Sequence, residues 1–345
     1  MRVLITGTSG FKGAWLAYWL KILGSKVYGI SLKPEKDSIL FKSLQLNKKI
    51  DQHFSDITNF DKLNCLVKKI KPDIIFHLAA QSIVSKSFIK PGETFRTNIL
   101  GSANILETFR LNKIPYLVYI TSDKCYLNLD SKKSYKENDT LGGLDNYSSS
   151  KASAELIFSS YFNSYFKNNK NLTVASARAG NVIGGGDMKE NRIVPDIIKS
   201  IIQNKTLNLR NPRATRPWQH VLEPLSGYLL LGHRLLNKNL NTKITPSWNF
   251  GPKVKNCKDV SLITQLVLEN WNMKNFKLRT DKVSKYYESK FLSLNIKKAK
   301  KELNWKPRLN LKETVKFTVD WYKNYFENKS VQKFTENQIQ SFLEK

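Results

Sequence analysis

The N-terminal segment constrains the fold of this chain more than any other feature. The apolar run 2–6 leads directly into Gly7-Thr-Ser-Gly10-Phe-Lys-Gly13, and an amphipathic segment then continues to Leu23. Glycines at this spacing let the chain turn sharply, let its backbone approach a pyrophosphate and let a helix pack closely on a strand. The spacing alone also fits a simple turn, but here it joins a predicted strand to a predicted helix. We therefore predict a dinucleotide site that uses Gly7, Ser9, Gly10, Phe11 and Gly13.

Apolar, strand-like runs alternate with helical patterns through the first half of the chain. After a second strand near 24–31, the pattern predicts a helix at 61–70, a strand at 73–80, a long helix at 94–111, a strand at 116–120, a helix at 146–166 and a strand at 172–177. This alternation is typical of an α/β protein with a Rossmann-like, doubly wound parallel sheet. Ligands of such sheets bind at the carboxyl ends of the strands.

The texture of the sequence changes after Arg178, where glycine-rich and arginine-rich loops begin. We predict a Rossmann domain at 1–180, with segments near 205–235 returning to it. A smaller C-terminal α/β domain at 181–330 would mainly bind substrate, with helices at 195–202, 222–236, 261–271, 297–303 and 311–326, and a basic stretch reaching residue 290. Residues 331–345 are expected to form a polar, mobile tail.

Composition contributes mainly exclusions, apart from a net charge of +29. That charge could mark a nucleic acid, an anionic membrane surface or an acidic substrate. The lysines are dispersed rather than clustered, which favours solvated faces and argues against a nucleic-acid partner. No run of 18 apolar residues and no signal peptide are present, so a membrane partner is not expected. The three cysteines lack metal-ligand spacing, which predicts no metal site and reduced thiols in the cytoplasm.

A hydroxyl, a carboxylate and an ammonium stand side by side at Ser122, Asp123 and Lys124, directly after the strand at 116–120. Tyr147 and Lys151 are spaced i,i+4, which places them on one face of the next predicted helix. A tyrosine beside a lysine can deprotonate an alcohol, since the ammonium stabilises the phenolate. The additional acid and base permit loss of water. These five residues predict a dehydratase that borrows a hydride.

The remaining cofactor contacts are predicted from strand ends. An acid usually follows the second strand of NAD-binding folds, but this chain has Ser31-Leu-Lys33, and Lys33 could either favour a 2′-phosphate or be solvated. His77 is predicted to be a packed core histidine. Small residues after it would allow close approach of a flat cofactor. The full set adds Ser31, Asp56, Ile57, Leu78, Ala79, Ala80, Asn98, Tyr147 and Lys151.

Cationic loop residues predict the substrate site. A diphosphate carries two negative charges, and guanidinium groups pair with it bidentately. Any one of these arginines could instead be an ordinary surface residue, and Arg192 and Arg216 are the strongest candidates. The predicted substrate contacts are Gln81, Asn181, Arg192, Arg210, Arg216 and His220.

The residues named so far resemble those of the extended short-chain dehydrogenase/reductases that act on nucleotide sugars. The glycine motif and the Tyr147/Lys151 pair are shared across that superfamily. Longer strings are similar to those of the CDP-glucose 4,6-dehydratases, namely Thr121-Ser-Asp-Lys-Cys-Tyr126, Ala179-Gly-Asn-Val-Ile-Gly-Gly-Gly-Asp187 and the arginine-rich string from Arg210 to Leu225. The resemblance runs from residue 1 to about residue 322.

This resemblance implies bound NAD, a CDP-glucose substrate, a homodimer and a place in deoxysugar synthesis for a surface polysaccharide. It implies that Tyr147 with Lys151 takes the proton of the 4-hydroxyl while Ser122 hydrogen-bonds the same oxygen. A protonated Asp123 would donate to the departing 6-hydroxyl. Lys124 stands where many related enzymes have Glu, and would either accept the C5 proton or stabilise the enolate.

Three other functions remain open at this point. A UDP-N-acetylhexosamine 4,6-dehydratase can also carry an Asp-Lys pair, although the string from Arg210 to Leu225 argues against it. A nucleotide-sugar 4-epimerase needs no acid and base at Asp123 and Lys124. A reductase-fold protein that binds RNA without catalysis would fit the net charge but not the intact set of five residues.

Overall fold

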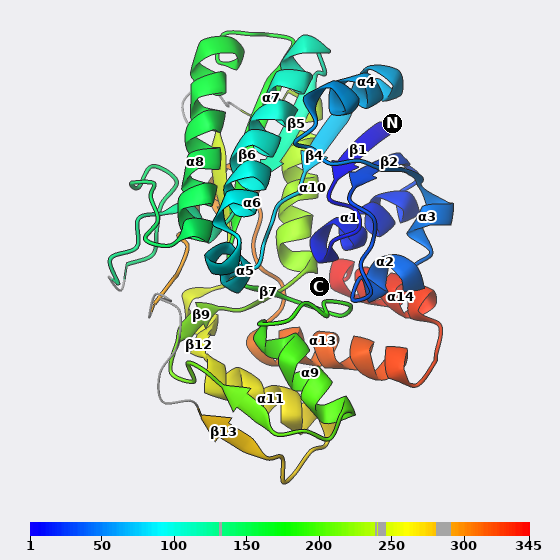
Figure 1. The fold of residues 1–345 in the computed structure, drawn as a ribbon, viewed down its shortest axis with the longest axis vertical. Helices are drawn as coiled ribbons and strands as arrows, with labels where there is room; N and C mark the ends of the chain where they lie inside the picture. Colours follow the sequence, from blue (N-terminus) through cyan, green and yellow to red (C-terminus); the bar gives the residue numbers. More distant parts are fainter. Residues whose placement is uncertain (131–132, 239, 241–245, 281–290) are drawn as a thin grey trace.

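A parallel sheet of seven strands forms the centre of the molecule (Figure 1). The computed structural model describes residues 1–130, 133–238, 240, 246–280 and 291–345. The strand order is β11-β6-β5-β4-β1-β2-β3. The strands are β1 (Arg2–Thr6), β2 (Lys26–Ser31), β3 (Asp51–Phe54), β4 (Ile74–His77), β5 (Tyr116–Ile120), β6 (Thr173–Ala179) and β11 (Ser247–Phe250). From the neighbouring strands β1 and β4, the strands that follow in the sequence are added outward in opposite directions. The predicted doubly wound parallel sheet is therefore confirmed.

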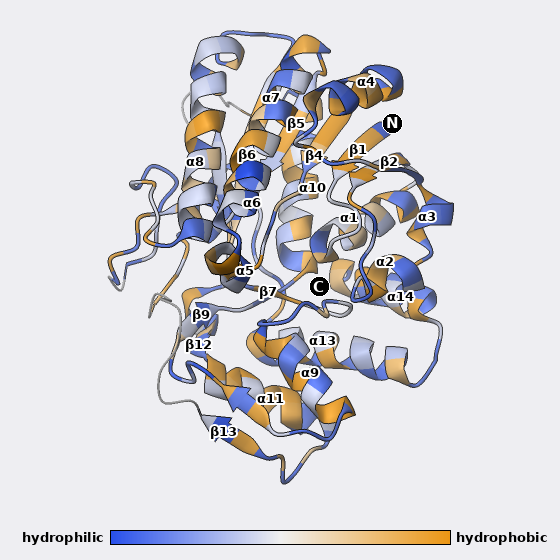
Figure 2. Ribbon diagram, in the orientation of Figure 1, coloured by the Kyte–Doolittle hydropathy of each residue, from blue (hydrophilic) through white to orange (hydrophobic). Residues whose placement is uncertain are grey.

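Helices cover both faces of the sheet because its strands are apolar on both sides. Leu4 of β1 belongs to one buried cluster, whereas Val3 and Ile5 belong to the other. The first face carries α4 (Phe60–Ile70), α7 (Gly101–Leu111) and α8 (Asn146–Tyr161). The second carries α1 (Phe11–Ile22) and α10 (Leu222–Leu236). Figure 2 shows the resulting hydrophobic strands inside and mixed polarity on the helices outside.

The predicted long helices contain local irregularities. The helix expected at 94–111 begins earlier, with α6 (Pro91–Phe95), and reaches α7 through a π-helical turn at Arg96–Leu100. The helix expected at 146–166 ends with another π-helical turn, at Phe162–Phe166. Short helices connect the remaining strands: α2 (Ile39–Ser43), α3 (Leu46–Lys49), α5 (Val84–Ile89) and the 3₁₀ turns Asp123–Cys125 and Val254–Asn256.

A smaller region lies beyond the carboxyl ends of the strands, in the lower part of Figure 1. It contains α9 (Ile193–Ile202), α11 (Val260–Trp271) and α13 (Leu311–Phe326), while α12 (Lys297–Leu303) packs near β11. Three small sheets support it: β7 (Val182–Ile183) with β10 (Gln219–His220), β8 (Leu207–Leu209) with β13 (Leu278–Thr280), and β9 (Thr215–Pro217) with β12 (Cys257–Asp259). Both α10 and β11 return to the main sheet. The last part of the predicted basic stretch lies outside the described residues.

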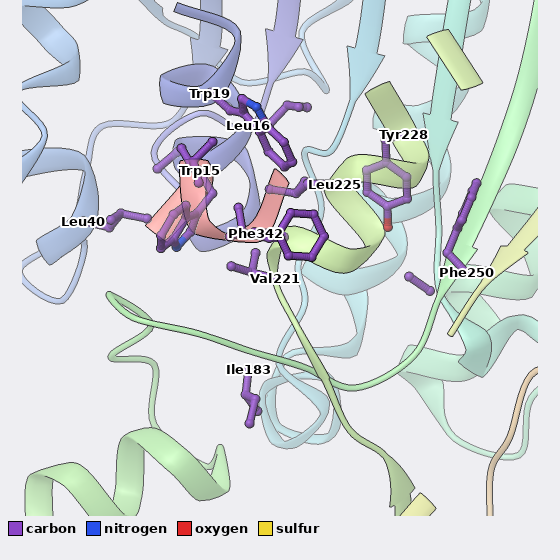
Figure 3. Close-up of a cluster of buried hydrophobic side chains, with 14 of the residues drawn as sticks. Trp15, Leu16, Trp19, Leu40, Ile183, Val221, Leu225, Tyr228, Phe250 and Phe342 are labelled. Atoms are coloured by element: carbon purple, nitrogen blue, oxygen red, sulfur yellow. The ribbon is translucent and has the colours of Figure 1, made fainter. Parts of the chain in front are cut away.

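The expected polar tail is wrong, because residues Val331–Leu343 form helix α14. Ile339 and Phe342 are buried, and the Phe342 ring packs edge-on against Trp19 of α1 at 6.0 Å. Figure 3 shows Phe342 inside the cluster that α1 and α10 build. The Tyr18 hydroxyl adds a hydrogen bond of 2.5 Å to Glu336. A few apolar residues at helical spacing therefore outweigh the polar composition of this segment.

Candidate active site

The glycine loop between β1 and α1 is packed so closely that larger residues would not fit. Gly7 has φ +82°, and a Cβ there would lie 2.8 Å from the Ala79 nitrogen. A Cβ on Gly13 would lie 2.1 Å from the Gly7 carbonyl oxygen. The loop thus holds the start of α1 against the ends of β1 and β4, and leaves backbone amides open to a ligand. The residues present fit a dinucleotide diphosphate.

The end of β4 is fixed by a buried hydrogen-bond chain. His77 Nδ1 lies 2.8 Å from the Thr6 hydroxyl, and its Nε2 lies 3.2 Å from the Ser102 hydroxyl. Burial lowers the pKa of His77 to about 3, so the ring is neutral. The Ala79 amide donates to the Thr6 hydroxyl. His77 is therefore a packed core histidine, as the sequence predicted, and it sets the position of the partly exposed residues Leu78, Ala79 and Ala80.

The other predicted cofactor residues differ in their surroundings. Ser31 is buried and its hydroxyl donates to the Leu32 carbonyl, whereas Asp56 is exposed and accepts from the Thr58 amide. Ile57 is buried beside Gly101. These positions follow β2 and β3, along the sheet edge that would face an adenine nucleotide.

Asn98 and Gln81 bind one another rather than facing the cleft. The Asn98 side chain accepts from the Gln81 amide, donates to the Gln81 carbonyl and donates to Ser150. The Gln81 side chain bonds the Thr94 hydroxyl and the backbone of Ile83. The structure therefore does not support the predicted ligand contacts of these two residues, because their polar groups already hold the loop after β4 against the helices.

One cleft collects four of the five predicted catalytic groups from two distant stretches of sequence, and Lys151 is not among its lining residues. The cleft has a volume of about 290 Å³. The side chains of Ser122, Asp123 and Lys124 enter it from the end of β5, and Tyr147 enters from the first turn of α8. The Asp145 side chain caps this helix by accepting from the Ser148 amide. The predicted substrate residues Asn181, Arg192, Arg210 and Arg216 also line the cleft.

Asp123 is arranged as a carboxylic acid. It is 3% exposed, and its Oδ1 accepts a 3.0 Å hydrogen bond from Ser122. Its Oδ2 is buried and has no hydrogen-bond partner among the described residues. A Cβ on Gly180 would lie 2.9 Å from this oxygen, so the glycine leaves room beside it. Burial raises the pKa of Asp123 against the opposing pull of Lys124, which favours the protonated form.

Tyr147 lies near this acid, and Lys151 is buried one helical turn further along α8. Burial lowers the pKa of Lys151 to about 8, and the nearby Lys12 lowers it further. Burial raises the pKa of Tyr147 to about 12, while Ser122 and Arg192 act to lower it. Burial dominates here, because removing the phenolate from water raises its free energy more than Ser122 and Arg192 lower it.

A buried ion pair between Glu155 of α8 and Arg178 of β6 connects the two catalytic stretches. Glu155, one helical turn after Lys151, accepts from the Thr121 hydroxyl and lies 2.6 Å from Arg178 of β6. Arg178 also donates to the Tyr126 hydroxyl at 2.8 Å. The motifs in the sequence did not predict this network. The i,i+4 spacing of Lys151 and Glu155 was the only nearby sequence pattern that pointed to it, because Arg178 lies on a separate strand.

The cationic residues have different roles in the structure. Arg192 pairs with Asp187 at 2.7 Å and donates to Ser82 at 2.8 Å. Arg210 bonds Asn191, and Arg216 is 5% exposed beside the cleft. These three guanidinium groups stand where a diphosphate could lie.

His220 does not belong to this set, and its predicted substrate contact is a correction. It is fully buried between the rings of Trp15 and Phe317, at 6.1 Å and 5.5 Å. Burial lowers the pKa of His220 to about 3. It follows Gln219 in a strand whose partner is β7, and this pairing turns the imidazole into the core. In the sequence, only the nearness of His220 to the arginines suggested a substrate contact.

No group of three or more His, Cys, Asp or Glu residues suited to a metal ion occurs in the part of the chain that the structure describes. None of the described helices is both long and apolar enough to span a bilayer.

Comparison with known proteins identifies the family. The sequence profile of the GDP-mannose 4,6 dehydratase family matches residues 4–318. The chain belongs to this family. It is 39% identical to the CDP-glucose 4,6-dehydratase of Salmonella typhimurium, over 99% of this chain and 96% of that protein. It is 24% identical to the UDP-glucose 4-epimerase of Mycoplasma genitalium, over 94% of this chain and 97% of that protein.

Solved structures with the same fold include several NAD complexes. The dTDP-glucose 4,6-dehydratase of Bacillus anthracis in complex with NAD matches with a TM-score of 0.79 and 22% identity, covering 97% of this chain and 99% of that chain. The UDP-glucuronic acid 4-epimerase of Bacillus cereus matches with a TM-score of 0.80 and 22% identity, covering 94% and 100%. The predicted fold class and the predicted family are both confirmed.

Proposed function

We propose that this protein is an NAD-dependent CDP-glucose 4,6-dehydratase, which converts CDP-D-glucose to CDP-4-dehydro-6-deoxy-D-glucose and water. The placement of Asp123 and Lys124 in one cleft with Tyr147 is the observation that carries the dehydratase reaction. The nucleotide is supported by the 39% identity with a CDP-glucose 4,6-dehydratase across almost the whole chain. The product suits deoxysugar synthesis for a surface polysaccharide.

The glycine loop, Tyr147 and Lys151 would hold NAD at the carboxyl edge of the sheet. Bound NAD would supply a hydride acceptor for the sugar C4 and would later return the hydride to C6. Lys151 is 5% exposed and its ammonium has no hydrogen-bond partner among the described residues, so it is available to cofactor hydroxyls. An NAD requirement, rather than NADP, is supported by the NAD complexes of the structural neighbours.

Tyr147 is the base for the 4-hydroxyl. Its phenolate would accept that proton while the Ser122 hydroxyl donates a hydrogen bond to the same sugar oxygen. The raised pKa of the free phenol means that it needs added positive charge, and the oxidised nicotinamide and Lys151 would provide it. The product of this step is a 4-ketone, which acidifies the hydrogen on C5.

Asp123 and Lys124 would then remove water. Asp123 donates its proton to the departing 6-hydroxyl, for which its raised pKa and its Oδ2, which has no hydrogen-bond partner among the described residues, are suited. Lys124 lines the same cleft and has no side-chain hydrogen bond among the described residues, so its amine is available to the C5 proton. The alternative role, stabilisation of the enolate, uses the same position.

Arg192, Arg210 and Arg216 would bind the substrate diphosphate, with Asn181 beside them in the cleft. Bidentate guanidinium pairing neutralises both phosphates. The Asp187 carboxylate orients Arg192 for this task.

We also propose that the enzyme is a cytoplasmic homodimer. Exposed apolar side chains follow the outer helices of the first face of the sheet, at Leu100, Leu111, Leu156 and Tyr165. A two-fold pairing of α7 and α8 would cover them. Light scattering would give the mass of two 39.8 kDa chains, whereas a single chain would contradict the pairing.

Incubation with CDP-glucose and NAD tests the proposed reaction. We expect a product lighter by one water, with the alkaline absorbance of a 4-keto sugar, and no comparable product from GDP-, UDP- or dTDP-glucose. Tyr147→Phe should remove the activity while the protein stays folded. Formation of CDP-galactose without loss of water would favour an epimerase. RNA binding with no turnover of any sugar would refute the enzymatic assignment.

A further inference from the structure

Lys12 is a cleft residue that the proposed mechanism does not use. It is the second residue of α1 and lies inside the glycine motif, between Phe11 and Gly13. Its side chain lines the same cleft as Asp123, Tyr147 and Arg192. No hydrogen bond or ion pair holds its ammonium among the residues that the structure describes.

Burial and the nearby cations make this position unfavourable for a cation without a ligand, against the opposing effect of Asp123. The N-terminus of α1 is itself the positive end of the helix dipole. Arg192 and Lys151 stand near the Lys12 ammonium from the start of α9 and from α8. Among the described residues, Asp123 is the acid that raises the pKa of Lys12, and burial favours the neutral form of that acid. Burial and Arg192 together lower the pKa of Lys12 to about 8.

The charge of the whole cleft shows the same imbalance. Five cationic side chains line it, against the three acids Asp123, Asp187 and Asp196. Asp187 is already paired with Arg192, and burial raises the pKa of Asp196 to about 6. Positive charge therefore remains to be neutralised by an anionic ligand. Lys151 adds to this excess of positive charge deeper in the site. It is 5% exposed, and its ammonium has no hydrogen-bond partner among the described residues.

We propose that the Lys12 ammonium binds a diphosphate group and is a binding residue of this cleft. The inference rests on the proposed function, which supplies two diphosphates, one in NAD and one in CDP-glucose. The glycine loop beside Lys12 suits the first, and the neighbouring Arg192 suits the second. The charge of Lys12 therefore destabilises the ligand-free protein, and a bound diphosphate stabilises that charge.

Two substitutions separate binding from a structural role. Lys12→Met keeps the aliphatic stem and removes the charge, and Lys12→Arg restores a cation. Lys21→Met on the last turn of the same helix is the matched control, because Lys21 is exposed. Lys12→Met should raise the melting temperature of the ligand-free protein by about 1–3 °C, since it relieves repulsion at the helix N-terminus. A side chain needed only for packing would lower it.

Binding is measured by titration calorimetry with NAD and separately with CDP, at low and high salt. Loss of one charge-assisted contact should weaken one ligand about 10- to 100-fold, and Lys12→Arg should restore most of the affinity. A loss confined to NAD assigns the cofactor diphosphate, and a loss confined to CDP assigns the substrate diphosphate. Equal affinity of wild type and Lys12→Met for both ligands overturns the inference and leaves the proposed function intact. Wild-type protein that binds neither ligand overturns both.

Proton uptake gives an independent readout. An anion favours the charged ammonium, so binding raises the pKa of Lys12 and the affinity falls as pH rises above about 8. Lys151 titrates near the same pH, while Arg192 stays charged and burial raises the pKa of Asp123. The difference in proton uptake between wild type and Lys12→Met at pH 8 therefore reports Lys12 together with its effect on Lys151. No difference would contradict the proposed contact.

Discussion

The buried pair between Glu155 and Arg178 gives the most quantitative prediction. Both side chains are almost fully buried, with 1% and 4% exposure, and their charged atoms are 2.6 Å apart. Glu155 also accepts from Thr121 and from Ser176. Glu155→Gln keeps the shape but leaves the Arg178 guanidinium without a counter-charge in a dry environment.

Removal of one partner from such a pair costs about 3–5 kcal/mol of unfolding free energy, because the remaining ion stays desolvated. Arg178 keeps its hydrogen bonds to Tyr126 and to the Glu137 carbonyl, which places the expected loss near the lower end, about 3 kcal/mol. The double variant Glu155→Met with Arg178→Met removes both charges. It should therefore be less destabilised than the sum of the two single changes Glu155→Met and Arg178→Met, with a coupling free energy of about 2–3 kcal/mol.

Urea unfolding followed by the fluorescence of the seven tryptophans measures these differences. Asp320→Asn is the control, because it breaks the exposed Lys316–Asp320 pair, and it should cost about 0.5 kcal/mol or less. The Thr121 link also predicts lower kcat for Glu155→Gln, since Thr121 precedes Ser122. A loss below about 1 kcal/mol with additive single changes would refute the view that this pair is desolvated and coupled.

Three further changes test the site. Gly13→Ala should weaken NAD binding by more than about tenfold, measured by calorimetry, because its Cβ would lie 2.1 Å from the Gly7 carbonyl and force the loop apart; unchanged affinity would contradict the close packing. Asp123→Asn should lower kcat about 10²- to 10⁴-fold and leave a 4-keto sugar that has lost two hydrogens but no water. In the wild type the dehydration rate should decline at alkaline pH as Asp123 loses its proton, and this decline should vanish in the variant. Lys124→Ala should still oxidise C4 but should lose exchange of the C5 hydrogen with solvent, and undiminished exchange would remove Lys124 as the base.

The sequence predicted the sheet well because buried parallel strands carry their own apolar runs. The end of β5 and the start of α8 also follow from local patterns, so Ser122, Asp123, Lys124 and Tyr147 could be assigned to one site. Their strand-end and helix-start positions determine where the side chains point, whatever the rest of the chain does.

Contacts between residues that are far apart in the sequence could not be predicted in this way. Gln81 and Asn98 are occupied by one another, and His220 is turned inward by the pairing of its strand with β7. Glu155 finds Arg178 on a strand that comes later in the chain. Composition also misled for residues 331–345, where Phe342 docks on α1 although most of the segment is polar.

The central claim is that one cleft moves a hydrogen from C4 to C6 of the same sugar while water leaves. CDP-glucose deuterated at C4 tests it directly, in deuterium-free water and with excess unlabelled NAD. The account predicts a 4-keto-6-deoxy product whose C6 methyl group carries the deuterium, with the C5 hydrogen drawn from solvent. A methyl group without deuterium, or a label found in free NAD, would contradict it.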